Sequence, residues 1–140
     1  MIIGFTGTQR GMTQRQKDAL TFLIYSYVQH TSGHLFMRNG DCIGADHEAG
    51  YITQTMLRDG NLHLHPSNIR EKRAFQKGLQ ITEPLPPLKR NRYIAGAVAG
   101  FPTHVLIACP GESHEVQRSG TWATIRYARK AGTPVIILLP

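Results

Sequence analysis

Three short glycine-bearing segments of the chain combine the residue types that bind phosphate. They are Gly7-Thr8-Gln9-Arg10-Gly11, the segment from Gly40 to Asp46, and Arg118-Ser119-Gly120-Thr121. Glycine lets the backbone approach an anion closely and adopt positive φ. Hydroxyl groups in the first and third segments add hydrogen-bond donors, and one arginine in each adds positive charge. Together the segments predict a binding site for a phosphorylated ligand.

The spacing of these glycines matches neither of the common nucleotide-binding loops. A P-loop needs a glycine followed by lysine and a hydroxyl residue, and the dinucleotide fingerprint needs three glycines at fixed positions. Neither pattern occurs in the three segments. We therefore expect neither a P-loop nucleoside triphosphatase nor an ordinary Rossmann dehydrogenase.

Two carboxylates, Asp41 and Asp46, lie within the second segment. A carboxylate beside a nucleotide site can accept hydrogen bonds from ribose hydroxyls. Asp41 also stands just before a helical pattern, where an aspartate can cap the helix. We expect ligand contact for Asp46 and favour helix capping for Asp41.

Hydrophobic periodicity alternates between strand and helix patterns along the chain. Thr13 and Gln16 have the spacing of a capping box, and Gly60 is placed to end the second helix. The pattern predicts strands at 2–5, 35–37, 61–65, 103–108 and 134–139, and helices at 13–31, 45–56, 89–99 and 119–131. This alternation predicts a single α/β domain over residues 1–140, with a Rossmann-like, doubly wound, mainly parallel sheet and helices on both faces. In such a sheet the three segments meet at the carboxyl edge, where ligands bind.

Net charge, the length of apolar runs and the spacing of cysteines and histidines limit the classes of function that the chain can have. The 140 residues carry a formal charge of +7, which favours anionic partners such as nucleotides or nucleic acid. No apolar run is long enough to span a membrane, and the chain starts without a basic leader, so we expect a cytoplasmic protein with no membrane partner. Two cysteines and seven histidines lack the spacing of a zinc site, so no metal is predicted.

The order of four segments resembles the SLOG superfamily, which includes the DNA-processing protein A (Smf) proteins and the "Lonely guy" phosphoribohydrolases. The segments are Gly7-Thr8-Gln9-Arg10, residues 40–46, residues 90–96, and Arg118-Ser119-Gly120-Thr121 followed by Thr124 and Arg126-Tyr127-Ala128. The resemblance covers nearly the whole chain. It implies a Rossmann-like sheet whose glycine-rich loops bind nucleotide phosphates or a nucleic-acid backbone, and it implies self-association into a homo-oligomer.

The resemblance also implies roles for individual residues. The first phosphate-facing loop would contain Gly7, Thr8 and Arg10, and the second would contain Gly40, Asp41, Gly44 and Asp46. The helix after the proline-rich segment would bring Arg90, Asn91 and Arg92 to the site. A second phosphate or the ribose would be held by Arg118, Ser119, Gly120 and Thr121.

The chain departs from the phosphoribohydrolases where their catalytic glutamates stand. Those enzymes have a Pro-Gly-Gly-x-Gly-Thr loop, whereas here Pro110-Gly111 is separated from Gly120-Thr121 by residues 112–119. Trp122, Ala123 and Thr124 occupy the positions after the loop, which leaves only Glu112 or Glu115 to substitute. Cleavage of an N-glycosidic bond needs a carboxylate. We therefore assign no catalytic residue.

The sequence thus predicts a protein that binds a nucleotide or nucleotide-derived small molecule, as a sensor, carrier or sequestering protein, with no other cofactor. One alternative is a nucleotide phosphoribohydrolase. Another is a single-stranded DNA-binding protein of the DNA-processing protein A type, for which Tyr93 and Trp122 would be the stacking aromatics. Trp122 could equally pack between helix and sheet.

Overall fold

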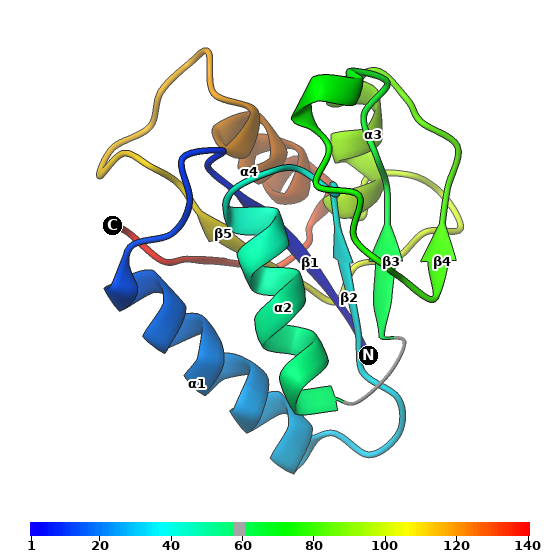
Figure 1. Ribbon diagram of the computed structural model, residues 1–140, viewed down its shortest axis with the longest axis vertical. Helices are drawn as coiled ribbons and strands as arrows, with labels where there is room; N and C mark the ends of the chain where they lie inside the picture. The colour runs from blue at the N-terminus through cyan, green and yellow to red at the C-terminus, as the bar shows by residue number, and fades with distance from the viewer. Residues whose placement is uncertain (58–60) are drawn as a thin grey trace.

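The computed structural model describes residues 1–57 and 61–140, which fold around one six-stranded sheet (Figure 1). The spatial order is β4-β3-β2-β1-β5-β6, and every neighbouring pair is parallel. The strands are β1 (Ile2–Gly7), β2 (Phe36–Asn39), β3 (Leu62–Leu64), β4 (Gln80–Ile81), β5 (Val105–Cys109) and β6 (Val135–Ile137). The predicted Rossmann-like, doubly wound α/β fold is confirmed.

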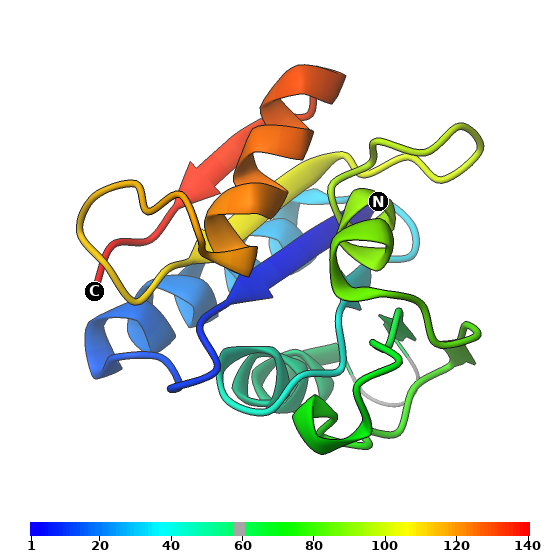
Figure 2. The ribbon, with the colours of Figure 1, turned by 90° about the horizontal axis from the view of Figure 1, so that it is seen from above.

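Two helices cover each face of the sheet (Figure 2). Helices α1 (Gln14–His30) and α2 (Ala45–Leu57) lie on one face, and α3 (Pro87–Ile94) and α4 (Gly120–Ala131) lie on the other. Side chains of β1 alternate between these layers: Ile3 and Phe5 are buried in the α1/α2 core. Gly4 faces α3, where a Cβ would collide with the carbonyl oxygen of Ile94, so only glycine lets this helix approach so closely.

Local sequence signals set most helix boundaries. Thr13 caps α1 and forms the predicted capping box with Gln16. The predicted helix at 89–99 is wrong at both ends: α3 begins at Pro87, which suits a first helical turn, and ends at Ile94. Gly96 follows with φ 74°, which leaves the helical region. The predicted end of α2 at Gly60 lies outside the described residues.

The irregular region between β3 and α3 holds a strand that the pattern did not predict. Gln80 and Ile81 pair with His63 and Leu64 to form β4 at the sheet edge. Two paired residues give no alternating pattern that could be recognised in sequence. A short 3-10 helix, η1 (Arg70–Lys72), precedes this strand.

The strand order reverses at β1. From β1 the chain moves outward through β2, β3 and β4, then crosses back to β5 on the other side of β1. Ligands of open α/β sheets bind in the crevice at such a reversal, outside the carboxyl ends of the strands. No helix among the described residues has the length and apolar character required to cross a membrane.

Candidate functional site

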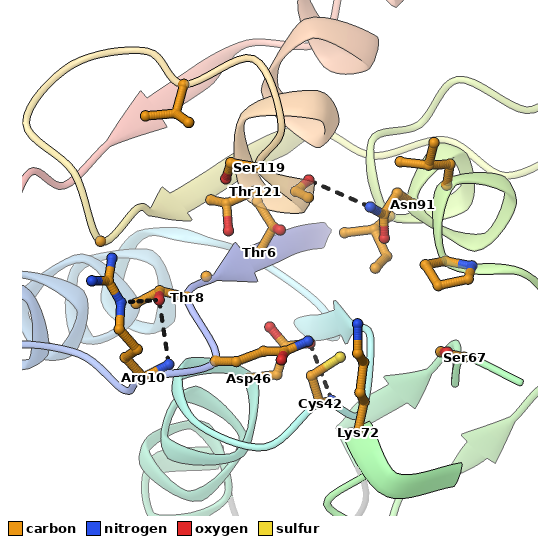
Figure 3. Close-up of a pocket in the computed structure, with 18 of the residues that line it drawn as sticks. Thr6, Thr8, Arg10, Cys42, Asp46, Ser67, Lys72, Asn91, Ser119 and Thr121 are labelled. Atoms are coloured by element: carbon orange, nitrogen blue, oxygen red, sulfur yellow. Dashed lines mark hydrogen bonds between the residues drawn. The ribbon is translucent and has the colours of Figure 1, made fainter. Parts of the chain in front are cut away.

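A cavity of about 490 Å³ lies at the carboxyl ends of β1, β2 and β5, next to the start of α4 (Figure 3). Its size is in the range of small-molecule sites. Ten of the residues predicted from the sequence line it: Gly7, Thr8, Arg10, Asp46, Arg90, Asn91, Arg118, Ser119, Gly120 and Thr121. Four others, Gly40, Asp41, Gly44 and Arg92, do not line it.

The N-terminus of α4 presents unoccupied backbone donors to this cavity. Ser119 caps the helix, and its Oγ accepts a hydrogen bond from the Trp122 amide at 3.3 Å. Within residues 1–57 and 61–140, the amides of Gly120 and Thr121 have no acceptor. These amides and the positive end of the helix dipole together favour an anion.

The loop after β1 forms the wall opposite α4. The amide of Thr8 donates to the Cys109 carbonyl at 3.1 Å, which ties the ends of β1 and β5 together. The Thr8 hydroxyl accepts a hydrogen bond from the Arg10 amide at 3.3 Å. The Arg10 guanidinium lies 3.2 Å from a carboxylate oxygen of Glu112, which reaches across from the loop after β5.

Four amides of the loop after β2 are already bonded within the protein. The amides of Gly40 and Cys42 donate to Oδ2 of Asp46 at 3.0 and 3.3 Å. Those of Ile43 and Ala45 donate to backbone carbonyls of other segments. These four amides are therefore not free to bind a phosphate, because the protein's own acceptors occupy them.

Asp46 is a buried carboxyl in the cavity wall. Among the described residues, only Oδ2 of Asp46 has a hydrogen-bond partner. Oδ1 has none, but it is not fully buried. The only fully buried side-chain polar atoms without a partner in this part of the chain are Arg38 Nε and Arg90 Nε. Burial raises the pKa of Asp46 to about 6, against the opposing effects of the Arg90 charge and the two amides. Asp46 lines the cavity and keeps one carboxyl oxygen without a partner among the described residues, so it could accept a hydrogen bond from a ligand.

Asp41 does not cap α2, contrary to the favoured expectation. Its carboxylate is fully buried and binds Arg73 and the Gln76 amide instead, the latter at 2.8 Å. Asp41 adopts φ 53°, which directs its side chain away from the cavity and toward the segment 70–76. Asp41 is therefore a structural link between two loops.

The remaining predicted residues have supporting positions. The Arg90 guanidinium is buried and donates to the carbonyls of Gly40 and His65 and to Cys42 Sγ, so it braces the loop after β2. Arg92 points elsewhere, with its guanidinium 5.3 Å from the Tyr127 ring. Gly44 has φ 81°, and a Cβ there would collide with the backbone of Gln9.

The lining residues that the sequence did not assign to the site include Thr6, Ser67, Lys72 and Glu112. In the sequence, the grouping of Lys72, Arg73 and Lys77 is typical of a solvated helix face. In the structure Lys72 instead points into the cavity (Figure 3). Arg73 is held by Asp41. No local signal could have found Lys72, because its position depends on a contact between residues far apart in sequence.

The aromatic residues considered for DNA stacking are engaged within the protein. Trp122 is buried in the α3/α4 core, and its Nε1 donates to Glu112 at 3.3 Å. Tyr93 stacks on His65 at a centroid distance of 5.4 Å and meets the edge of Phe101. Of the two roles left open for Trp122, the structure shows packing.

The fold and cavity define a Rossmann-like α/β protein with a polar cavity at the reversal point of its sheet. Comparisons with models of protein families, with curated proteins and with solved structures find no match to this chain. Among the described residues, no cluster of three His, Cys, Asp or Glu side chains could hold a metal ion.

Proposed function

We propose that this protein binds a nucleotide or nucleotide-derived small molecule in the cavity, as a sensor, carrier or sequestering protein. The main support is the convergence of the unoccupied Gly120 and Thr121 amides with the hydroxyl of Thr8 around one cavity. The phosphate of the ligand would lie at the start of α4. The resemblance to the SLOG superfamily supports the same choice of ligand.

The other cavity groups suit the rest of a nucleotide. The open oxygen of Asp46 can accept a ribose hydroxyl. Pro87, Leu88 and Ile94 provide an apolar wall against which a base can lie.

Substitution of Gly120 tests the proposal. A Cβ at Gly120 meets only Asn91 Nδ2, at 3.9 Å, so Gly120→Asp fits the fold and places a negative charge at the phosphate position. For wild type, a nucleoside 5′-monophosphate at about 100 times its Kd should raise the free energy of unfolding by about 2.7 kcal/mol. Gly120→Asp should abolish this rise in a thermal-shift titration.

Gly100→Asp is the control for charge, because Gly100 has no neighbour within 4 Å and lies outside the cavity. Its φ of 79° adds about 1 kcal/mol of strain, which lowers the baseline stability but not the response to ligand. The variant makes the same charge change and should keep the wild-type response. Equal responses of both variants would show that the ligand does not bind at the start of α4.

Hydrolysis of the N-glycosidic bond is the second candidate, favoured by a buried carboxyl, Asp46, whose pKa is raised to about 6 within the cavity. Such an enzyme would release free base from nucleoside monophosphates. Chromatographic detection of base that disappears with Asp46→Asn would establish turnover, and its absence across a nucleotide panel would exclude it.

A further inference from the structure

Two basic side chains that line the cavity have no acidic partner among the described residues. They are Arg118, just before α4, and Lys72, at the end of η1. The other two lining arginines are engaged: Arg10 pairs with Glu112, and Arg90 is buried among carbonyl and sulfur acceptors. The cavity therefore has two separate positions where positive charge is uncompensated.

The start of α4, which Arg118 immediately precedes, and Lys72 lie on different walls. Figure 3 shows Ser119 and Thr121 on the upper wall, with Lys72 rising from the lower wall and its ammonium group directed into the cavity. Asp46 and Cys42 are drawn between Lys72 and the Arg10 side of the cavity. One ligand phosphate at the start of α4 would leave Lys72 without an anionic partner.

The backbone of Lys72 is fixed rather than free. Its carbonyl accepts the Ile43 amide at 3.0 Å, and the following residue, Arg73, is bound to the buried Asp41 carboxylate. The Ala74 amide donates to the Asp41 carbonyl at 2.7 Å. This set of contacts anchors the segment to the loop after β2, with Lys72 at the cavity wall.

The lower wall, from which Lys72 rises, also carries the Asp46 carboxyl, whose Oδ1 has no partner among the described residues. A carboxylate repels phosphate and accepts hydroxyl hydrogens. The cavity thus offers two separate cationic positions and a hydroxyl acceptor, which together complement a sugar that carries two separated anionic groups.

We infer that the ligand carries two separated anionic groups, one bound at the start of α4 with Arg118 and the other bound by Lys72. Nucleoside bisphosphates with phosphates on both sides of the ribose, and dinucleotides, belong to this class. Nucleotides with one phosphate chain do not. This inference rests on the proposed nucleotide-binding function and specifies the ligand class.

Calorimetric titration of four synthetic probes tests the inference: adenosine 5′-monophosphate, adenosine 5′-diphosphate, adenosine 3′,5′-bisphosphate and the 5′-phosphorylated adenine dinucleotide, with the guanine series in parallel. At least one probe with separated charges should bind about tenfold tighter than the monophosphate, because a charged hydrogen bond contributes about 1.5–3 kcal/mol. The 5′-diphosphate adds charge at one end only and should lack this dependence on Lys72.

Lys72→Met should remove the advantage of the separated-charge probe and leave monophosphate affinity within about twofold. Lys77→Met is the control, because Lys77 belongs to the same segment, is exposed and does not line the cavity. Equal affinities for all probes, or a uniform loss of affinity in Lys72→Met, would overturn the inference while the proposed function stands. No binding by any probe would contradict both.

Discussion

The Asp41 carboxylate and the Arg73 guanidinium form a two-point ion pair, with Nε and Nη2 of Arg73 each 3.1 Å from Oδ2. Asp41 is fully buried, and Arg73 comes from a segment 32 residues away. The pair joins the loop after β2 to the segment that carries Lys72. It is the contact on which the lower wall of the cavity depends.

Arg73→Met should destabilise the fold by about 3 kcal/mol, because it leaves a buried carboxylate without its counter-charge. Chemical denaturation measures this loss. Arg126→Met removes the pair with Glu115, which is well exposed on both sides, and should cost less than about 1 kcal/mol. Similar losses for the two variants would show that the Asp41 pair has no special structural role.

Gly44→Ala should destabilise the fold by about 3 kcal/mol or more, because the methyl group would press on the backbone of Gln9 at a residue with positive φ. Gly100→Ala separates the two causes: Gly100 has φ 79° but open space around it. It should lose only about 1 kcal/mol. If both variants unfold at the same denaturant concentration, the contact between the two loops is not tight.

Asp46→Asn should change the pH dependence of stability. The pKa of Asp46 is about 6 in the fold and has an ordinary value of 3.8, so the native state binds the proton more strongly than the unfolded state. The resulting stabilisation is complete below about pH 4 and is lost as the pH rises through about 6. Relative to Asp46→Asn, the wild type should therefore lose up to about 3 kcal/mol over this interval. A difference that is constant with pH would contradict the shift.

Glu112→Gln should raise the affinity for an anionic ligand about threefold, because it releases Arg10 from its carboxylate partner. Glu115→Gln should leave affinity unchanged, since Glu115 pairs with Arg126 and does not line the cavity. Calorimetry of both variants provides the comparison. Loss of base-releasing activity in Glu112→Gln would instead assign Glu112 to catalysis.

Much of the fold could be predicted because its signals are local. Thr13 and Gln16 mark the start of α1, and Ser119 marks the start of α4 through a cap that needs only neighbouring residues. Continuous apolar runs identify β1 and β5, whose flanking strands and helices bury them on both faces. Strand β4 could not be predicted, because only its pairing with β3 defines it.

The glycine-rich segments of the cavity wall could be predicted from the sequence. Which amides are free and which charged side chains reach the cavity could not. Glycine patterns place Gly7 and Gly120 at the carboxyl edge of any parallel sheet. Whether an amide is free or occupied depends on side chains that fold back, as Asp46 does onto Gly40 and Cys42. The position of Lys72 likewise depends on the pair between Asp41 and Arg73, which no local pattern encodes.

The most direct measurement is a nuclear magnetic resonance titration that follows individual backbone amides while a nucleoside 5′-monophosphate is added. The Gly120 and Thr121 amides, which have no acceptor among the described residues, should shift strongly and saturably. The Gly40 amide, already bonded to Asp46, should move much less. Saturable shifts that spare Gly120 and Thr121, or no shifts at millimolar ligand, would contradict nucleotide binding at this cavity.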